Sequence, residues 1–265
     1  MTVLLKTLVF NLIYNKNKHV YFYCRLIEKG KIESSKVRRG RPAGRSVKGE
    51  QTRSLLYAVA LKMFDDHGYE DTTLRQIAQR AELSPGLLYR YFPNKRAIVL
   101  ELYRQLSADY ARQVTNMKEG SWRDRFLFAL QTSLEVLGPH RATLCSIIPA
   151  LISRGDEGLF SSKTRFAREP VQAAFVSAVK NSKDAPKQVQ ELGWILYLAH
   201  LAIILFWLLD RTENQQGTKK LLLMVTQARM LMGLAVSTPV FSKLIFHFAR
   251  ISQTALLEHT ELVEV

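Results

Sequence analysis

TTLRQIAQRAELSPGLLYRYFPNK, residues 72–95, reads as two short helices joined by a tight turn. Thr72 or Thr73 can cap the first helix by accepting hydrogen bonds from its free amide groups. Apolar residues then recur at helical spacing and predict one buried stripe, formed by Leu74, Ile77, Ala78 and Ala81. Because Ala78 is small, a second helix can cross the first closely, and the stretch predicts a helix-turn-helix.

The second helix starts at Ser84, a capping residue that is followed by Pro85 at the first helical position. Leu88 and Phe92 are expected to face the core. The other side chains face outward or flank the core, and they form an aromatic and cationic surface: Pro85, Gly86, Leu87, Tyr89, Arg90 and Tyr91. Such a surface is unusual for solvation alone and indicates DNA. Lys95 begins the next helix, where backbone amides can also hold a phosphate.

The segments 72–78, 83–89 and 91–92, together with Lys95, resemble the helix-turn-helix signature of the tetracycline-repressor (TetR) family. The resemblance covers residues 53–102. Two residues depart from the family's pattern, since Glu82 stands where a glycine is usual and Arg96 where an acidic residue is usual. Without glycine, position 82 must tolerate a crowded or positive-φ backbone.

This resemblance implies an all-α fold, in which a three-helix DNA-binding head precedes a multi-helix domain for ligand binding and dimerisation. It implies phosphate contacts from Thr73, Tyr89 and Lys95, with Ser84 as a further contact. Base edges would be met by Pro85, Gly86, Leu87 and Arg90. Arg90 is predicted to contribute most to specificity, because a guanidinium can bond guanine O6 and N7 together.

Charge patterning also indicates a polyanionic partner. The 265 residues carry a formal net charge of +15, which favours nucleic acid or an anionic membrane surface. Residues 36–51 form a basic arm before the head, and we expect Arg41 to enter a narrow minor groove. The alternative is a solvated linker. Residues 1–35 read as an extension, either a loose appendage or the product of a start site assigned too far upstream.

Helical periodicity continues beyond the arm. Residues 52–98 are predicted to form the head, starting with an amphipathic helix over 52–67 that Gly68 ends. The apolar side of this helix is expected to be formed by Leu55, Leu56, Val59, Ala60, Met63 and Phe64. Residues 99–260 are predicted to form the second domain. Its helices are expected over 94–118, 122–137, 141–153, 159–181, 186–210, 219–237 and 241–258, with glycines and prolines marking their limits.

Residues 192–209 are nearly all apolar and reach the lower length limit of a membrane span. A basic helical protein anchored to a membrane by this segment is therefore an alternative function. Against it stand Gly193 and His200 inside the segment and the lack of a second predicted span. A helix that is apolar all round also suits an oligomer interface. We expect no stable membrane insertion and a homodimer through this helix and the next, as the resemblance also implies.

Aromatic residues of the middle helices have two interpretations, core packing or the lining of a ligand cavity. Trp194, Tyr197 and His200 are the candidates for the cavity of a small apolar or amphipathic inducer, which the family resemblance implies. No sequence motif indicates catalysis, a cofactor or a metal site, and an enzyme is not expected. Cys24 and Cys145 lack metal-ligand spacing and predict free thiols in the cytoplasm.

Together these features predict a sequence-specific DNA-binding transcriptional regulator. It is expected to act as a homodimeric repressor on double-stranded DNA, with its two heads in successive major grooves of a palindromic operator. Ligand binding in the helical domain would change the spacing of the heads and release the DNA.

Overall fold

The computed structural model describes residues 47–152 and 158–257. Arg41, the extension over 1–35 and most of the basic arm lie outside the described residues. The chain divides into two compact units, 1–99 and 100–265, close to the predicted boundary between residues 98 and 99. Each unit is described here by itself.

Within residues 47–99 of the first unit, the structure describes three helices and the start of a fourth: α3 (Val47–His67), α4 (Leu74–Arg80), α5 (Pro85–Tyr91) and the first turn of α6 (Lys95–Val114). Its core is built from the residues predicted to face inward, and Leu56, Ala60, Phe64, Ile77, Ala78, Leu88 and Phe92 are all buried. Gly68 ends α3 with φ of 86°, a conformation that glycine adopts without strain. Leu55 was expected in the same stripe, but it is 36% exposed.

α3 begins five residues earlier than the sequence predicts, so the end of the expected arm is helical. Thr52 was expected to start this helix. Its hydroxyl instead donates to the carbonyl oxygen of Lys48, four residues back, at 2.9 Å. Such a bond satisfies the hydroxyl inside a helix and leaves Thr52 no capping role.

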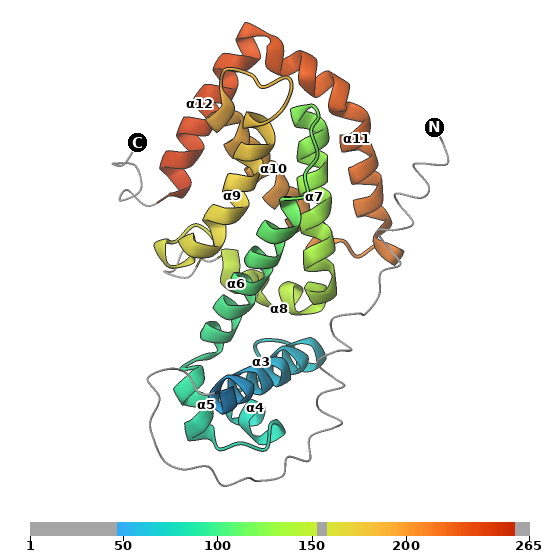
Figure 1. Cartoon of the computed structure of the whole chain (residues 1–265). Coiled ribbons are helices and arrows are strands. Elements are labelled where there is room, and N and C mark those ends of the chain that lie inside the picture. The colour runs from blue at the N-terminus through green and yellow to red at the C-terminus, as the bar shows by residue number, and fades with distance from the viewer. Residues whose placement is uncertain (1–46, 153–157, 258–265) are drawn as a thin grey trace. The chain divides into compact units, whose positions relative to one another are not determined.

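The second unit consists of helices, which Figure 1 colours by their order in the chain. After α6 come α7 (Trp122–Leu137), α8 (Arg141–Ile152), α9 (Arg165–Lys180), α10 (Val189–Leu209), α11 (Gln216–Ser237) and α12 (Pro239–Leu256). Short 3-10 turns occupy Gly138–His140, Ser162–Thr164 and Glu213–Gln215. The described residues contain no strand, and the predicted all-α fold is confirmed.

The predicted helix over 159–181 is shorter in the structure, because a turn precedes α9. The Thr164 hydroxyl lies within hydrogen-bond distance of the carbonyl oxygens of Gly158, Leu159 and Ser161. These contacts close the chain into a turn before Arg165, where α9 starts. A side-chain hydroxyl that competes for local carbonyls in this way is not visible in a hydrophobic pattern.

α10 is the central helix of the second unit and packs against α7, α8, α9, α11 and α12. Its approach to α9 is close at Gly193, where an added Cβ would lie 2.7 Å from Cα of Val176. Gly193 therefore has a packing role. The buried large side chains of α10 are Leu192, Trp194, Leu196, Tyr197, His200, Ile203, Trp207 and Leu208.

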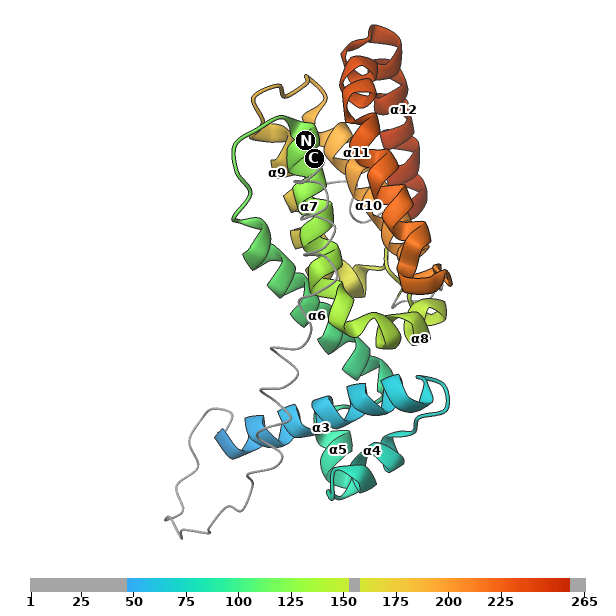
Figure 2. The same ribbon diagram turned by 90° about the vertical axis from the view of Figure 1, so that its right-hand side faces the viewer.

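The apolar residues left on the surface lie mainly on α11 and α12. These helices lie on one side of the second unit in Figure 2, and they meet at Thr238 and diverge from there in Figure 1. The sequence placed the oligomer interface on α10 and the helix after it, and the large apolar residues that α10 exposes are Leu205, Phe206 and Leu209. Large apolar side chains at least 40% exposed are Leu223, Met224, Met230, Leu231 and Leu234 on α11 and Val240, Phe241, Leu244, Phe246, Phe248 and Ile251 on α12. We call this set the α11–α12 apolar face.

Two helical segments are long and apolar enough to cross a membrane by length and composition, Val189–Leu209 and Glu213–Ser237. The second was not expected from the sequence. It has lower mean hydropathy, 1.3 against 2.2, and none of its most apolar window is buried. That segment contributes five of the eleven residues of the α11–α12 apolar face.

Candidate nucleic-acid interface

The first turn of α4 is held by a reciprocal pair of hydrogen bonds. The amide of Gln76 donates to the Thr73 hydroxyl at 3.2 Å, and the amide of Thr73 donates to Oε1 of Gln76 at 2.8 Å. This capping box identifies Thr73, and not Thr72, as the cap. Thr72 is buried, and its hydroxyl donates to the carbonyl oxygen of Gly68 at 2.8 Å. Thr73 remains exposed, as a phosphate contact requires.

The turn between α4 and α5 depends on Glu82, which adopts φ of 55°. The sequence predicted a crowded or positive-φ backbone here, because Glu82 stands where a glycine is usual. A left-handed backbone costs a non-glycine residue about 1 kcal/mol. The amide of Leu83 then donates to the carbonyl oxygen of Ala78 at 3.0 Å. This bond brings the start of α5 close to α4, and the small side chain of Ala78 permits the close approach.

α5 presents its predicted outer face to solvent. Ser84 caps the helix, with the amide of Leu87 at 3.3 Å from its hydroxyl. Leu88 is fully buried, whereas Tyr89 is 52% exposed and Arg90 is exposed as well. Leu87 is half-buried, beside the exposed Ser84, Pro85 and Gly86. All the residues proposed to contact bases therefore lie on one accessible helix.

Gly86 leaves open space on this face. A Cβ added to it would meet no atom of the chain within 4 Å. Internal packing therefore does not explain a glycine in the first turn of a helix, where it costs roughly 0.5–1 kcal/mol relative to alanine. A glycine there lets an external backbone or base edge come close.

Lys95 has a structural role that the sequence did not predict. Its ammonium group donates to the carbonyl oxygens of Tyr69 at 2.6 Å and Glu70 at 3.1 Å, and it lies 4.5 Å from the centre of the Tyr69 ring. These contacts tie the first turn of α6 to the segment between α3 and α4. An ammonium has three N–H donors, so one remains for a phosphate. The sequence did not predict the two carbonyl contacts, because the positions of these oxygens depend on the folded turn.

Two further arginines of α4, Arg75 and Arg80, strengthen the positive charge of the head. Both are exposed, and neither forms an ion pair or hydrogen bond with the part of the chain that the structure describes. The sequence placed Arg75 on the wet side of α4 without a role. Uncommitted guanidinium groups beside a helix that is predicted to read DNA are suited to phosphate contacts.

The residues predicted to line a ligand cavity meet in the interior of the second unit. Trp194, Tyr197 and His200 are at most 4% exposed. Nε1 of Trp194 donates to the Ser252 hydroxyl at 2.8 Å, and Nε2 of His200 lies 2.8 Å from the Ser133 hydroxyl. The rings also contact each other, with centres 5.6 Å apart for Trp194 and Tyr197. We call these three residues the aromatic cluster.

Burial determines the charge state of this cluster. It lowers the pKa of His200 to about 3 and raises the pKa of Tyr197 well above its usual value. Both side chains are therefore neutral at pH 7. Nδ1 of His200 has no hydrogen-bond partner among the described residues, which leaves one polar atom of the cluster available to a small molecule or a water.

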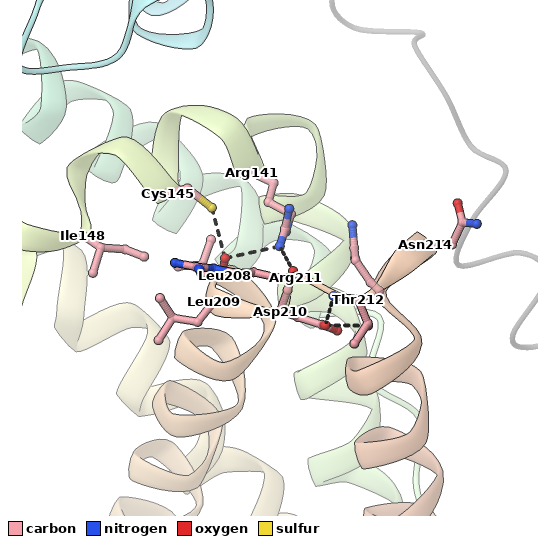
Figure 3. Close-up of a pocket in the computed structure, with 10 residues that line it drawn as sticks. Arg141, Cys145, Ile148, Leu208, Leu209, Asp210, Arg211, Thr212 and Asn214 are labelled. Carbon is pink, nitrogen blue, oxygen red and sulfur yellow. Dashed lines mark hydrogen bonds between the residues drawn. The ribbon is translucent and has the colours of Figure 1, made fainter.

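A separate pocket of about 550 Å³ lies where α8 meets the turn between α10 and α11 (Figure 3). No sequence motif pointed to it, because it combines residues from two distant segments. It is lined by Arg141, Cys145, Ile148, Leu208, Leu209, Asp210, Arg211, Thr212, Asn214 and Gln215. Within residues 47–152 and 158–257, no three potential metal-ligating side chains are grouped as a metal site.

Residues 56–102 match the family of bacterial regulatory proteins described as the tetR family. The HTH-type transcriptional regulator HbdR of Aromatoleum sp. (strain CIB) is 34% identical over 71 residues, which is 27% of this chain and 31% of HbdR. TcmR of Streptomyces glaucescens, also an HTH-type transcriptional regulator, is 39% identical over 59 residues, 22% of this chain and 26% of TcmR. The matched region thus spans a third or less of each of these relatives.

Solved structures are similar over a larger part of the chain. A tetR-family transcriptional regulator from Streptomyces coelicolor aligns with a TM-score of 0.52 at 19% identity, over 81% of this chain and 95% of that one. A tetR-family regulatory protein from Rhodococcus RHA1 aligns with a TM-score of 0.50 at 15% identity, over 67% and 96%. At these identities the likeness shows the fold.

Proposed function

We propose that this chain, whose residues 56–102 match the tetR family of bacterial regulatory proteins, is a transcriptional regulator that acts as a homodimeric repressor on a palindromic operator and releases the DNA when a small ligand binds. The observation that carries the proposal is the exposed outer face of α5, bounded by Ser84 and Arg90. Its helix is capped, its inner residues are buried, and its outer residues include an arginine, a tyrosine and an unobstructed glycine. HTH-type regulators do not catalyse reactions, and no enzymatic activity is proposed.

We propose the residue roles within the head from the family resemblance and from side-chain chemistry. Arg90 can donate two parallel hydrogen bonds to guanine, which discriminates against other bases by about 1–3 kcal/mol. Leu87 can contact a thymine methyl group. Thr73, Tyr89 and Lys95 stand beside these residues as phosphate contacts, which position the head without reading sequence.

Dimerisation is proposed through the α11–α12 apolar face. Monomeric proteins rarely expose so much contiguous apolar surface. Since α11 and α12 lie on the same side of the second unit (Figure 2), a two-fold axis would bring four helices together and bury the same surface on both subunits. A second copy of the chain also supplies the second head that a palindromic operator requires.

Release by a ligand is proposed to involve the aromatic cluster in the second unit. Its ring faces and the free Nδ1 of His200 suit a neutral molecule with an apolar body and a hydrogen-bonding group. We expect such a regulator to work in the cytoplasm, where the operator is.

The test of the DNA-reading role is selection of bound duplexes from a random library by the wild-type protein and by Arg90→Ala. We expect the variant to lose the base preference at one position of each half-site while it keeps salt-sensitive binding to DNA in general. Arg112→Ala, an exposed arginine far along α6, is the matched control and should keep every preference. Unchanged preferences in Arg90→Ala would contradict the role.

A further inference from the structure

The pocket at the turn between α10 and α11 is distinct from the aromatic cluster and shares no residue with it. In Figure 3, Cys145 and Ile148 of α8 lie on one side, Thr212 and Asn214 lie on the other, and the last residues of α10 lie between them. The proposed DNA-reading and dimerisation roles do not use this pocket.

Arg141 is held in place at the edge of the pocket. Its Nη2 donates to the carbonyl oxygens of Trp207 at 3.0 Å and Asp210 at 2.8 Å, and its Nε is 3.3 Å from the Trp207 oxygen. A guanidinium has five N–H donors in a rigid plane. These bonds use the edge formed by Nε and Nη2 and leave the two N–H groups of Nη1 available.

Asp210, the one acidic residue of the lining, forms no ion pair with Arg141 or Arg211. Its carboxylate accepts hydrogen bonds from the amide and hydroxyl groups of both Thr212 and Thr218, at 2.6–2.9 Å. These bonds hold the pKa of Asp210 far below its usual value, so the carboxylate is ionised and fully engaged. Its neighbour Arg211 is exposed and makes no hydrogen bond or ion pair with the described residues.

The rest of the lining is apolar on the α8 side. Ile148 of α8 and Leu208 and Leu209 of α10 lie there, and Leu209 is 58% exposed. An exposed leucine beside two arginines favours a ligand with both an apolar and an anionic part. The described residues neither cover this leucine nor form ion pairs with the two arginines.

The opposite wall has a strained backbone. Asn214 and Gln215 have φ of 50° and 56°, a conformation that costs non-glycine residues about 1–2 kcal/mol each. The strained segment is held by a 2.8 Å hydrogen bond from Nε1 of Trp207 to Oε1 of Gln215. Strain of this kind is often retained where it shapes a binding site.

We propose that this pocket binds a small carboxylate that carries an apolar chain or ring. Arg211 and the Nη1 edge of Arg141 hold the carboxylate by charge-assisted hydrogen bonds, and Ile148 and Leu209 cover the apolar part. The proposal concerns ligand binding by the second unit and does not depend on operator binding.

Cys145 provides a direct readout, because it lines the pocket as a free thiol. The experiment measures the rate at which N-ethylmaleimide alkylates Cys145 in the full chain, followed by mass spectrometry of the Cys145 peptide. Octanoate, below its micelle concentration, is the probe, and 1-octanol is its neutral counterpart. We expect octanoate to slow the alkylation and 1-octanol to slow it at least about tenfold less effectively, since the carboxylate contacts are charge-assisted.

Two charge-matched variants locate the effect. Arg211→Gln should lose the protection by octanoate, and Arg250→Gln, which removes an exposed arginine of α12, should keep it. Both variants are checked for unchanged thermal unfolding. Equal protection by octanoate and 1-octanol, no protection by either, or full protection in Arg211→Gln would each overturn the proposal. These readouts use no DNA, so a failure to bind an operator leaves the result interpretable.

Discussion

Lys95 joins the start of α6 to the segment between α3 and α4, through carbonyl oxygens 25 and 26 residues earlier in the chain. Lys95→Met should lower the free energy of unfolding of the head by about 1–2 kcal/mol, because both carbonyls lose a charged donor at a partly exposed site. Lys62→Met, which removes an exposed ion pair with Asp66, should change it by less than about 0.5 kcal/mol.

Denaturant unfolding of the two variants measures this difference. The Lys95 variant should also weaken binding to all DNA sequences alike and reduce the salt slope by about one phosphate contact. Unchanged stability in Lys95→Met would show that the two carbonyl contacts contribute nothing, and the residue would then act on phosphate alone.

His200 predicts a pH dependence of stability in the second unit. Its pKa falls to about 3 on burial, whereas an unfolded histidine has a pKa of about 6.5. The unfolded chain therefore binds more protons between these values, and the stability that is complete above pH 6.5 is progressively lost as the pH falls toward 3.

Comparison of the wild type with His200→Gln tests this assignment. Glutamine can keep the bond to Ser133 but does not titrate. Between pH 6 and 4, the unfolding free energy of His200→Gln should fall less steeply with decreasing pH than that of the wild type. The two slopes should differ by up to about 1.4 kcal/mol per pH unit. His247→Gln, at an exposed histidine, should retain the wild-type slope. Parallel curves for His200→Gln and the wild type would contradict the buried, neutral state of His200.

At the scale of elements, the α11–α12 apolar face should control assembly. Leu231 is 69% exposed, so Leu231→Glu should leave the subunit folded while it places a charge in the proposed interface. We expect the variant to sediment as a monomer at concentrations where the wild type is a dimer, and to bind a palindromic operator more weakly. Gln190→Glu, an exposed change on α10, should remain dimeric. A dimer that survives Leu231→Glu would move the interface elsewhere.

Much of the element pattern could be predicted because it depends on local chemistry. The capped starts of α4 and α5, the stop at Gly68 and the limits of α7 all follow from residues near each boundary. The burial of Leu88 and the exposure of Arg90 follow from helical period. The role of α10 did not follow, because an apolar helix suits a core and an interface equally, and only its packing against the neighbouring helices distinguishes the two.

The binding sites were harder to predict from the sequence, because they also depend on tertiary packing. The outer face of α5 could be predicted, since one short segment supplies it. The pocket in Figure 3 could not, because α8 and the turn after α10 contribute side chains more than 60 residues apart, such as Cys145 and Leu208 at 63 residues. The carbonyl contacts of Lys95 also depend on tertiary structure.

At the scale of the whole molecule, the net charge of +15 should appear in the salt dependence of DNA binding. The basic arm carries part of this charge and precedes the head in sequence. Deletion of residues 36–45 should flatten the dependence of log affinity on log salt, by about 0.9 for each phosphate that the arm neutralises. Titrations of one duplex with the full and shortened proteins measure the two slopes. Equal slopes would return the arm to the role of a linker.

The central claim is that the chain binds a particular DNA sequence, and the most direct test is binding of the purified protein to the DNA upstream of its own gene over a salt series. Scrambled DNA of the same composition is the control. We predict selective retention of the upstream sequence, with log affinity falling by about 0.9 per phosphate neutralised. No binding to either DNA at low salt would contradict the regulator and favour a membrane role for the apolar segments Val189–Leu209 and Glu213–Ser237.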